Sequence, residues 1–305
     1  MIRRFLISFG KFILFFAVWV SAISIPLSLW NTPEFLEQHP AWLRLYWELV
    51  PLLITAAITF VFIKYIDKDR VRLIFSVHWI RDSALGMVTS IIWICTIVLI
   101  LFAMGVISVG NESSIPMFWV YALSLLINTI TQELLVRGYP FSMIENKHGV
   151  VTATVSTTIL FLLMHGGAFE VGIIAVCNVI CASILLSLLR IYTKAIWATI
   201  VSHFIWNLIA GLVLGAIVLG DDIHIYTTSI YGGEIVSGGV AGIEGGVTTL
   251  AVTSLLIGIF YIVIRKDRAK NRSAKTALRH LPTNNTARNT PIENATIPND
   301  SRANV

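Results

Sequence analysis

Long apolar segments separated by short polar ones dominate the hydrophobic pattern of this 305-residue chain. A helix of roughly 20 apolar residues is long enough to cross a lipid bilayer. The pattern therefore predicts an all-α polytopic membrane protein with about eight transmembrane helices. The predicted spans lie near residues 12–30, 49–65, 84–109, 117–137, 150–166, 170–189, 195–219 and 247–264.

The composition supports this prediction, since 56% of the residues are hydrophobic and only 13% are charged. The formal net charge of +5 is uneven, because nine Lys or Arg and three Asp or Glu follow from Arg265 onward. Such a basic tail suits anionic lipid headgroups and gives no reason to expect a nucleic-acid partner. We predict a transmembrane domain over residues 1–264 and a disordered cytoplasmic tail over residues 265–305, which is polar and poor in aromatic residues.

The charges of the short loops predict the orientation of the chain in the membrane. Arg3, Arg4 and Lys11 precede the first predicted span, whereas loops 31–48 and 220–246 carry mainly acidic charge. Both termini are therefore expected in the cytoplasm, with the protein in the plasma membrane. Glycine is frequent at the end of the second acidic loop, which we interpret as a flexible connector.

A few ionisable and amide side chains interrupt the later apolar segments. Glu133 and Arg137 are four residues apart, so they share a helix face and can form an ion pair. His165 ends the next apolar segment, and His203 and Asn207 share a face of another. Ionisable residues at membrane depth usually face a cavity or each other, so these are candidate functional residues.

Together these residue types suit hydrolysis within an intramembrane polar cavity. A carboxylate near a histidine can activate water as a general base. A histidine and an asparagine on one face can stabilise an oxyanion. Alternatively, Glu133, His165 and His203 could bind zinc. Either site requires side chains at different predicted membrane depths to converge from three helices.

Three sequence motifs carry a resemblance to a known family. They are Gln132-Glu-x-x-x-Arg137-Gly, Phe161-x-x-x-His165 and His203-x-x-x-Asn207. In this order they resemble the CPBP family, the CAAX proteases and bacteriocin-processing enzymes, also called the Abi or type II CAAX prenyl endopeptidase family. The resemblance is strong over about residues 115–215.

This resemblance implies an intramembrane endopeptidase that cleaves membrane-associated or lipidated peptides with activated water. By correspondence of the motifs, His165 assists the activation of water, and His203 and Asn207 stabilise the oxyanion. The family has been described both as zinc-dependent and as glutamate-dependent, so zinc is a possible cofactor and the protein a metallo- or glutamic endopeptidase.

The chain departs from the family pattern at position 132, where the family has the first of two glutamates. Arg137 ties Glu133 to an ion pair, so Gln132 is the residue expected to face the cavity. An amide cannot accept a proton at neutral pH, and loss of a general base typically costs about 10²–10⁴ in rate. Proteolysis would then be weak, reassigned to Glu133, or lost.

Two alternatives remain beside the endopeptidase. A catalytically impaired family member could bind peptides or a partner protein in an immunity or regulatory role, which Gln132 favours. A small-solute transporter is disfavoured, because the sequence shows no inverted-repeat symmetry and its polar residues cluster in one short region.

Overall fold

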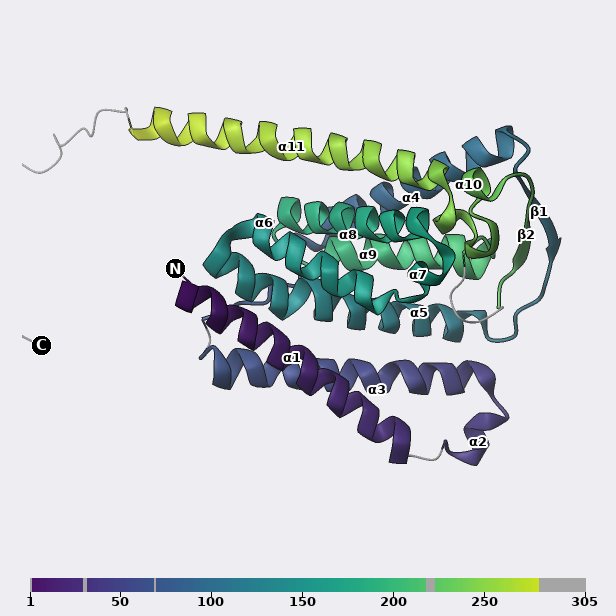
Figure 1. Ribbon diagram of the computed structural model, residues 1–305, viewed down its shortest axis with the longest axis horizontal. Helices are drawn as coiled ribbons and strands as arrows, with labels where there is room; N and C mark the ends of the chain where they lie inside the picture. Colours follow the sequence, from purple (N-terminus) through teal and green to yellow (C-terminus); the bar gives the residue numbers. More distant parts are fainter. Residues whose placement is uncertain (1, 30–31, 69, 218–222, 280–305) are drawn as a thin grey trace, which may run out of the picture. The chain divides into compact units, whose positions relative to one another are not determined.

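The computed structural model describes residues 2–29, 32–68, 70–217 and 223–279. The chain divides into two compact units after residue 262, and the packing described below concerns the first unit. The architecture is that of an all-α polytopic membrane protein, with long helices and one small sheet (Figure 1).

The elements follow one another closely along the chain. The long helices are α1 (Ile2–Leu29), α3 (Pro40–Val61), α4 (Trp79–Ala103), α5 (Phe118–Glu133), α6 (Tyr139–Met164), α8 (Ile173–Thr193), α9 (Trp197–Trp206) and α11 (Val247–Arg279). The short helices are α2 (Glu34–Glu37), α7 (Gly167–Val171) and α10 (Glu234–Ser237). Strands β1 (Ile107–Glu112) and β2 (Tyr226–Ile230) pair antiparallel, with Ile107 opposite Ile230. Three π-helical turns, η1 (Phe62–Ile66), η2 (Leu134–Gly138) and η3 (Asn207–Val213), extend α3, α5 and α9, and two 3₁₀ turns, η4 (Gly239–Ala241) and η5 (Ile243–Gly245), precede α11.

Among the described residues, six helical segments are long and apolar enough to cross a membrane. They are Leu6–Ile25, Pro40–Ile66, Trp79–Ala103, Phe118–Met164, Ile173–Thr193 and Val247–Lys270. Phe118–Met164 contains 47 residues, enough for the two predicted spans that it includes, and Trp197–Val213 is a shorter apolar helix. Membrane-spanning helices are thus confirmed, while the count of eight stays a prediction.

Helix α4 ends earlier than the apolar pattern predicted. We expected a span over residues 84–109, but α4 ends at Ala103 and β1 begins at Ile107. Gly105 has φ +67°, a left-handed conformation that glycine adopts without steric cost and that terminates helices. The resulting sheet was not part of the all-α prediction.

The predicted loop at 138–149 is also helical in the structure. Pro140 lies in the first turn of α6, where its missing N–H costs nothing. Tyr139 and Phe141 are fully buried, so the segment packs as part of the core. Gly149 interrupts the helix with φ +83°, at the place where the next span was expected to begin.

Within the predicted tail, α11 continues over residues 265–279 to Arg279, and the disorder of the tail stays a prediction. This stretch contains several Ala, Lys and Arg residues, which are strong helix formers. Residues 280–305 of the predicted tail lie outside the described residues.

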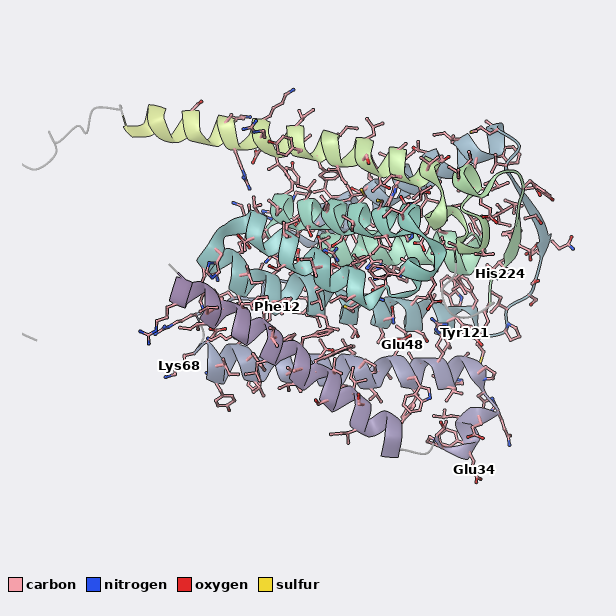
Figure 2. All side chains as sticks on the ribbon, in the orientation of Figure 1. Phe12, Glu34, Glu48, Lys68, Tyr121 and His224 are labelled. Carbon is pink, nitrogen blue, oxygen red and sulfur yellow. The ribbon has the colours of Figure 1, made fainter. Side chains whose placement is uncertain are left out.

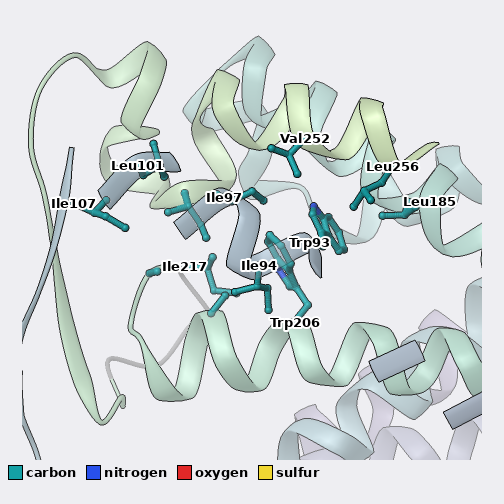
Figure 3. Close-up of a cluster of buried hydrophobic side chains, with 13 residues drawn as sticks. Trp93, Ile94, Ile97, Leu101, Ile107, Leu185, Trp206, Ile217, Val252 and Leu256 are labelled. Atoms are coloured by element: carbon teal, nitrogen blue, oxygen red, sulfur yellow. The ribbon is translucent and has the colours of Figure 1, made fainter. Parts of the chain in front are cut away.

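A buried cluster of hydrophobic side chains holds α4, α9 and the beginning of α11 together (Figure 3). Trp93 of α4 stacks on Trp206 of α9 with 4.0 Å between ring centroids, and its indole N–H donates to Thr253 at 2.8 Å. A Cβ on Gly86 would lie 2.5 Å from the Ala198 carbonyl oxygen, so α4 and α9 are in close backbone contact. This packing fixes the helix that carries His203.

Candidate active site

One cavity of about 490 Å³ brings the motif residues of three helical segments together. Gln132 reaches it from α5 and His165 from the end of α6, while His203 and Asn207 reach it from the junction of α9 with η3. The remaining parts of its walls are mainly apolar. Their apolar residues include Trp19, Ile23, Pro51, Leu125, Leu135, Met164, Val179, Ala182 and Leu186. The cavity is therefore amphipathic and of the size typical for ligand sites.

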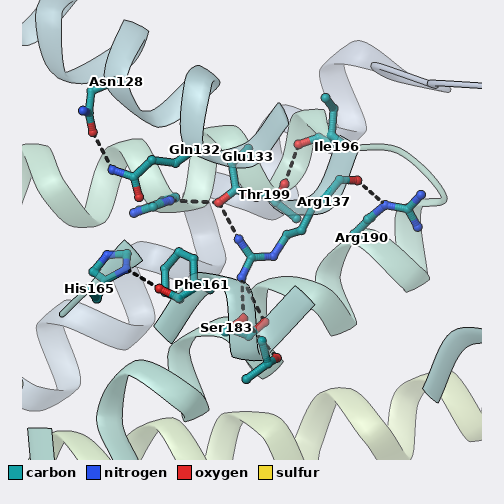
Figure 4. A network of polar contacts seen from close by, with 12 residues as sticks. Asn128, Gln132, Glu133, Arg137, Phe161, His165, Ser183, Arg190, Ile196 and Thr199 are labelled. Carbon is teal, nitrogen blue, oxygen red and sulfur yellow. Dashed lines mark hydrogen bonds and ion pairs between the residues drawn. The ribbon is translucent and has the colours of Figure 1, made fainter. Parts of the chain in front are cut away.

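Glu133 does not line the cavity, because its side chain is occupied behind the wall. Arg137 Nη1 donates to Glu133 Oε1 at 2.7 Å, and both side chains have no exposed surface. Arg137 Nη2 also donates to the carbonyl and hydroxyl oxygens of Ser183, at 3.1 and 3.0 Å (Figure 4). The ion pair expected from the four-residue spacing is present and joins α5 to α8, even though Arg137 lies in the π-helical turn η2.

The same carboxylate oxygen orients His203. Nδ1 of His203 lies 2.9 Å from Glu133 Oε1, and because a carboxylate only accepts, Nδ1–H must donate. This hydrogen bond leaves Nε2 as the ring atom available to a ligand in the cavity. Asn207 follows four residues later, where η3 begins, and lines the same cavity. π-helical turns frequently occur at functional sites, and both the first and the third motif meet one.

Phe161 brings the two motif histidines close to each other. The His165 ring packs on the Phe161 ring with centroids 4.2 Å apart, and its Nδ1–H donates to the Phe161 carbonyl at 2.8 Å. The His203 ring contacts the edge of Phe161 at 5.9 Å. The predicted difference in membrane depth therefore does not separate these side chains.

Gln132 occupies the cavity wall, as expected, and takes part in a chain of amide hydrogen bonds. Its Nε2 donates to Asn128 Oδ1 at 2.6 Å, and Asn128 Nδ2 donates to Glu48 Oε2 at 2.8 Å. Glu48 belongs to α3 (Figure 2) and also lines the cavity. Gln132 Oε1 is buried without a hydrogen-bond partner, so it can accept a hydrogen bond from water or from a substrate N–H.

Sequence reasoning missed Glu244, a cavity-lining residue that we had counted only as a charge of an acidic loop. Its Oε1 accepts the Trp206 indole N–H at 2.9 Å. Burial raises the pKa of Glu244 above its ordinary value, while the Trp206 hydrogen bond and His203 act in the opposite direction. The available signal was a single acid among glycines, directly before the last apolar span.

The loop that carries Glu244 is not a flexible connector, contrary to our interpretation of its glycines. Asn178 Nδ2 donates to the Glu244 and Gly246 carbonyl oxygens at 2.6 and 2.9 Å. Gly242 has φ +65°, and a Cβ there would lie 2.1 Å from the Ala216 carbonyl oxygen. Glycine permits this close backbone approach, so the loop is packed in place.

The residues proposed as zinc ligands do not form a metal site in this arrangement. Oε1 of Glu133 is shared by Arg137 and His203, and His165 Nδ1 donates to a backbone carbonyl. Among the described residues, no group of three His, Cys, Asp or Glu side chains is placed to hold a metal ion. A guanidinium on the required carboxylate opposes a second cation, so the donor set does not fit zinc.

Comparison with known proteins gives one family match. Residues 113–209 match the family described as type II CAAX prenyl endopeptidase Rce1-like. No curated protein and no solved structure matches the chain. The matched segment contains all three motifs and the four motif residues of the cavity wall, and it confirms the relationship to the CPBP family predicted from those motifs. Over residues 113–209 the chain is thus similar to the CAAX-protease-like family of membrane endopeptidases.

Proposed function

We propose that the protein is a membrane-embedded endopeptidase that hydrolyses membrane-associated or lipidated peptides with activated water. One observation carries this proposal: Gln132, His165, His203 and Asn207 all line the same amphipathic cavity. Two histidines and two amides in one wall supply both hydrogen-bond acceptors and donors, which acyl transfer to water requires.

In this proposal His203 and Asn207 donate hydrogen bonds to the oxyanion that forms when water attacks the scissile carbonyl. Asn207 donates from its amide, and a protonated His203 donates from Nε2 because Glu133 already accepts from Nδ1. Glu133 is therefore a positioning residue rather than the base, and Gln132 orients water or substrate. His165 is left with Nε2 as its acceptor.

The apolar walls support a substrate with a hydrophobic end. Trp19 and Ile23 of α1 and Pro51 of α3 line the same cavity as the motif residues. A prenyl or acyl chain would bury apolar surface there at roughly 25 cal/mol per Å². A lipidated peptide entering from the bilayer or the cytoplasmic face therefore suits the cavity better than a soluble one.

The proposal includes a location in the plasma membrane with both termini in the cytoplasm. The cations near the start of α1 and those from η1 to the first turn of α4 support this orientation, because positive residues concentrate at the cytoplasmic ends of membrane spans. The latter are Lys64, Lys68, Arg70, Arg72 and Arg81.

A second candidate function is peptide or partner binding without cleavage, in an immunity or regulatory role. Gln132 favours it, since this side chain occupies the cavity wall where the family has a glutamate and cannot remove a proton from water. The same cavity would then hold the peptide without hydrolysing it.

Cleavage of a fluorogenic prenylated peptide by the purified full chain in detergent tests the proposal. We expect cleavage by the wild type and a loss of about 10²–10³-fold in His203→Ala, the usual cost of an oxyanion donor. His39→Ala replaces an exposed histidine and should leave the rate unchanged. A metal chelator should have no effect, because the donor set does not fit zinc.

Equal rates in the wild type and His203→Ala would contradict the endopeptidase. Binding of the same peptide by both, measured by fluorescence anisotropy, would then favour the second candidate.

A further inference from the structure

The cavity contains two carboxylates that the matched domain does not supply. Glu48 and Glu244 are the acidic residues of its wall within the described part of the chain. Glu244 lies in η5, outside residues 113–209 and 112 positions after Gln132. It reaches the cavity only because the chain folds back onto α9.

Trp206 fixes the side chain of Glu244 next to the motif-three residues. His203 and Trp206 are three residues apart on α9, so their side chains lie on one face with Cβ atoms roughly 5–6 Å apart. The Trp206 N–H donates to Glu244 Oε1, and Glu244 also interacts electrostatically with His203. Stacking on Trp93 holds the indole itself in place.

The backbone around Glu244 is held equally firmly. Asn178 donates to two of its carbonyl groups, and Thr249 Oγ1 donates to the Ile243 carbonyl at 2.6 Å. Ile243 N–H in turn donates to the Ala216 carbonyl at 2.8 Å. A group that acts in catalysis needs such a preorganised position.

The other two carboxylates near the site are more fully engaged. Glu133 accepts from Arg137 and His203 and is not part of the cavity wall. Glu48 accepts from Asn128 and lies 3.9 Å from Arg44. Within the described part of the chain, Trp206 is the one hydrogen-bond partner of the Glu244 side chain.

We propose that Glu244 is the general base of the cavity, taking over the role that the amide of Gln132 cannot perform. This inference rests on the proposed endopeptidase function. It identifies the proton acceptor that the first motif lacks and assigns it to the loop before α11.

The chemistry balances with Glu244 as both acceptor and donor of one proton. The carboxylate takes a proton from water while the water oxygen forms a bond to the scissile carbonyl carbon, whose π electrons move to the carbonyl oxygen. When the tetrahedral intermediate collapses, the C–N bond breaks and Glu244 returns the proton to the leaving nitrogen. The products are a carboxylic acid and an amine, and Glu244 is again a carboxylate. Its raised pKa suits this exchange, since a base titrating closer to neutral pH is more effective.

The test measures kcat and KM for the fluorogenic prenylated peptide in variants of the full-length protein. Glu244→Gln keeps an oxygen that can accept the Trp206 N–H, so it should fold as the wild type does. Glu234→Gln is the matched control, because Glu234 is an exposed acid of the same loop outside the cavity wall. The double variant Gln132→Glu/Glu244→Gln places a carboxylate at the position that the family motif uses.

We expect Glu244→Gln to lower kcat at least 100-fold with KM and melting temperature unchanged, as for loss of a general base. Glu234→Gln should match the wild type, and the double variant should regain at least about tenfold of the lost kcat.

An active wild type that needs His203 but loses less than threefold in Glu244→Gln overturns the role of Glu244 and leaves the endopeptidase standing. A loss that appears in KM or melting temperature, or that Gln132→Glu does not reverse, also overturns it. Equal rates in the wild type and His203→Ala remove the endopeptidase itself, and the base with it.

Discussion

Glu133 and Glu244 are two carboxylates that interact with the same histidine, yet they differ in their access to the cavity and in their number of hydrogen-bond partners. Glu133 has no exposed surface and shares one oxygen between Arg137 and His203. Glu244 lines the cavity and accepts a single hydrogen bond from Trp206. In the proposed mechanism, the position of an acid in a family motif does not make it the proton acceptor. The number of its partners and its access to the cavity decide that role.

The two residues also differ in how they are held. The partner of Glu133 comes from the next turn of the same helical segment, so local geometry is enough to form the pair. Glu244 lies in a loop and depends on contacts from α8, α9 and the segment around Ala216. Mutations that remove the contacts of Glu133 and those that remove the contacts of Glu244 should therefore differ in their effects on stability, kcat and the pH profile.

The largest expected effect follows from removing the cation of the buried pair. Arg137→Ala leaves Glu133 as an uncompensated buried charge, which typically costs 3–5 kcal/mol, so about that loss is expected in the free energy of unfolding. Denaturant or thermal unfolding in detergent measures it. Arg72→Ala, at an exposed arginine, should change the same quantity by less than about 0.5 kcal/mol.

The reciprocal change, Glu133→Gln, should also destabilise the protein, because it leaves the buried Arg137 guanidinium without an anionic partner. If neither variant melts below the wild type, the pair does not have the structural role assigned to it here.

An intermediate effect is expected from loosening the loop of Glu244. Asn178→Ala removes two hydrogen bonds and should lower the free energy of unfolding by about 1–3 kcal/mol. It should also lower kcat about tenfold or more, since small displacements of a catalytic group are costly. Asn146→Ala, at an exposed position of α6, is the control for both measurements. An unchanged kcat in Asn178→Ala would show that catalysis does not require these two hydrogen bonds to hold the loop.

The smallest effect should be a shift in the pH profile. Burial raises the pKa of Glu244 and the Trp206 N–H opposes that rise, so Trp206→Phe should raise the pKa further. Because the base works as a carboxylate, activity appears only above this pKa. The acid limb of kcat/KM should therefore move to higher pH, because the charged form of Glu244 loses a hydrogen bond.

Phe at position 206 can still stack on Trp93, so folding should be little affected. An acid limb at the wild-type pH in Trp206→Phe would argue against titration of Glu244 in the reaction.

Sequence reasoning predicted the features that depend on local spacing. The apolar segments predicted helices, the four-residue spacing predicted the Glu133–Arg137 pair, and that pair in turn placed Gln132 at the cavity. Each of these inferences needs only helix geometry and the cost of placing polar groups in lipid. The motifs, in order, also predicted the family.

The remaining features depend on tertiary contacts that no local pattern encodes. The position of Glu244 is determined by hydrogen bonds from Asn178 and Trp206, which are 66 and 38 positions away in sequence. A glycine-rich loop suggests flexibility until the close approach of the Ala216 carbonyl group to Gly242 is known. The end of α4 depended on the conformation of one glycine, Gly105, which hydropathy does not register.

The hydrogen bonds from Asn178 and Trp206 to the loop before α11 also show that residues 113–209 alone do not contain the complete cavity wall. Both donors belong to residues 113–209, and both acceptors lie beyond that segment. A fragment cut after the matched domain would keep the motif histidines and Asn207 but lose the acid that faces them. Insertions or deletions in the loop could thus tune or silence this protein while every family motif remained intact.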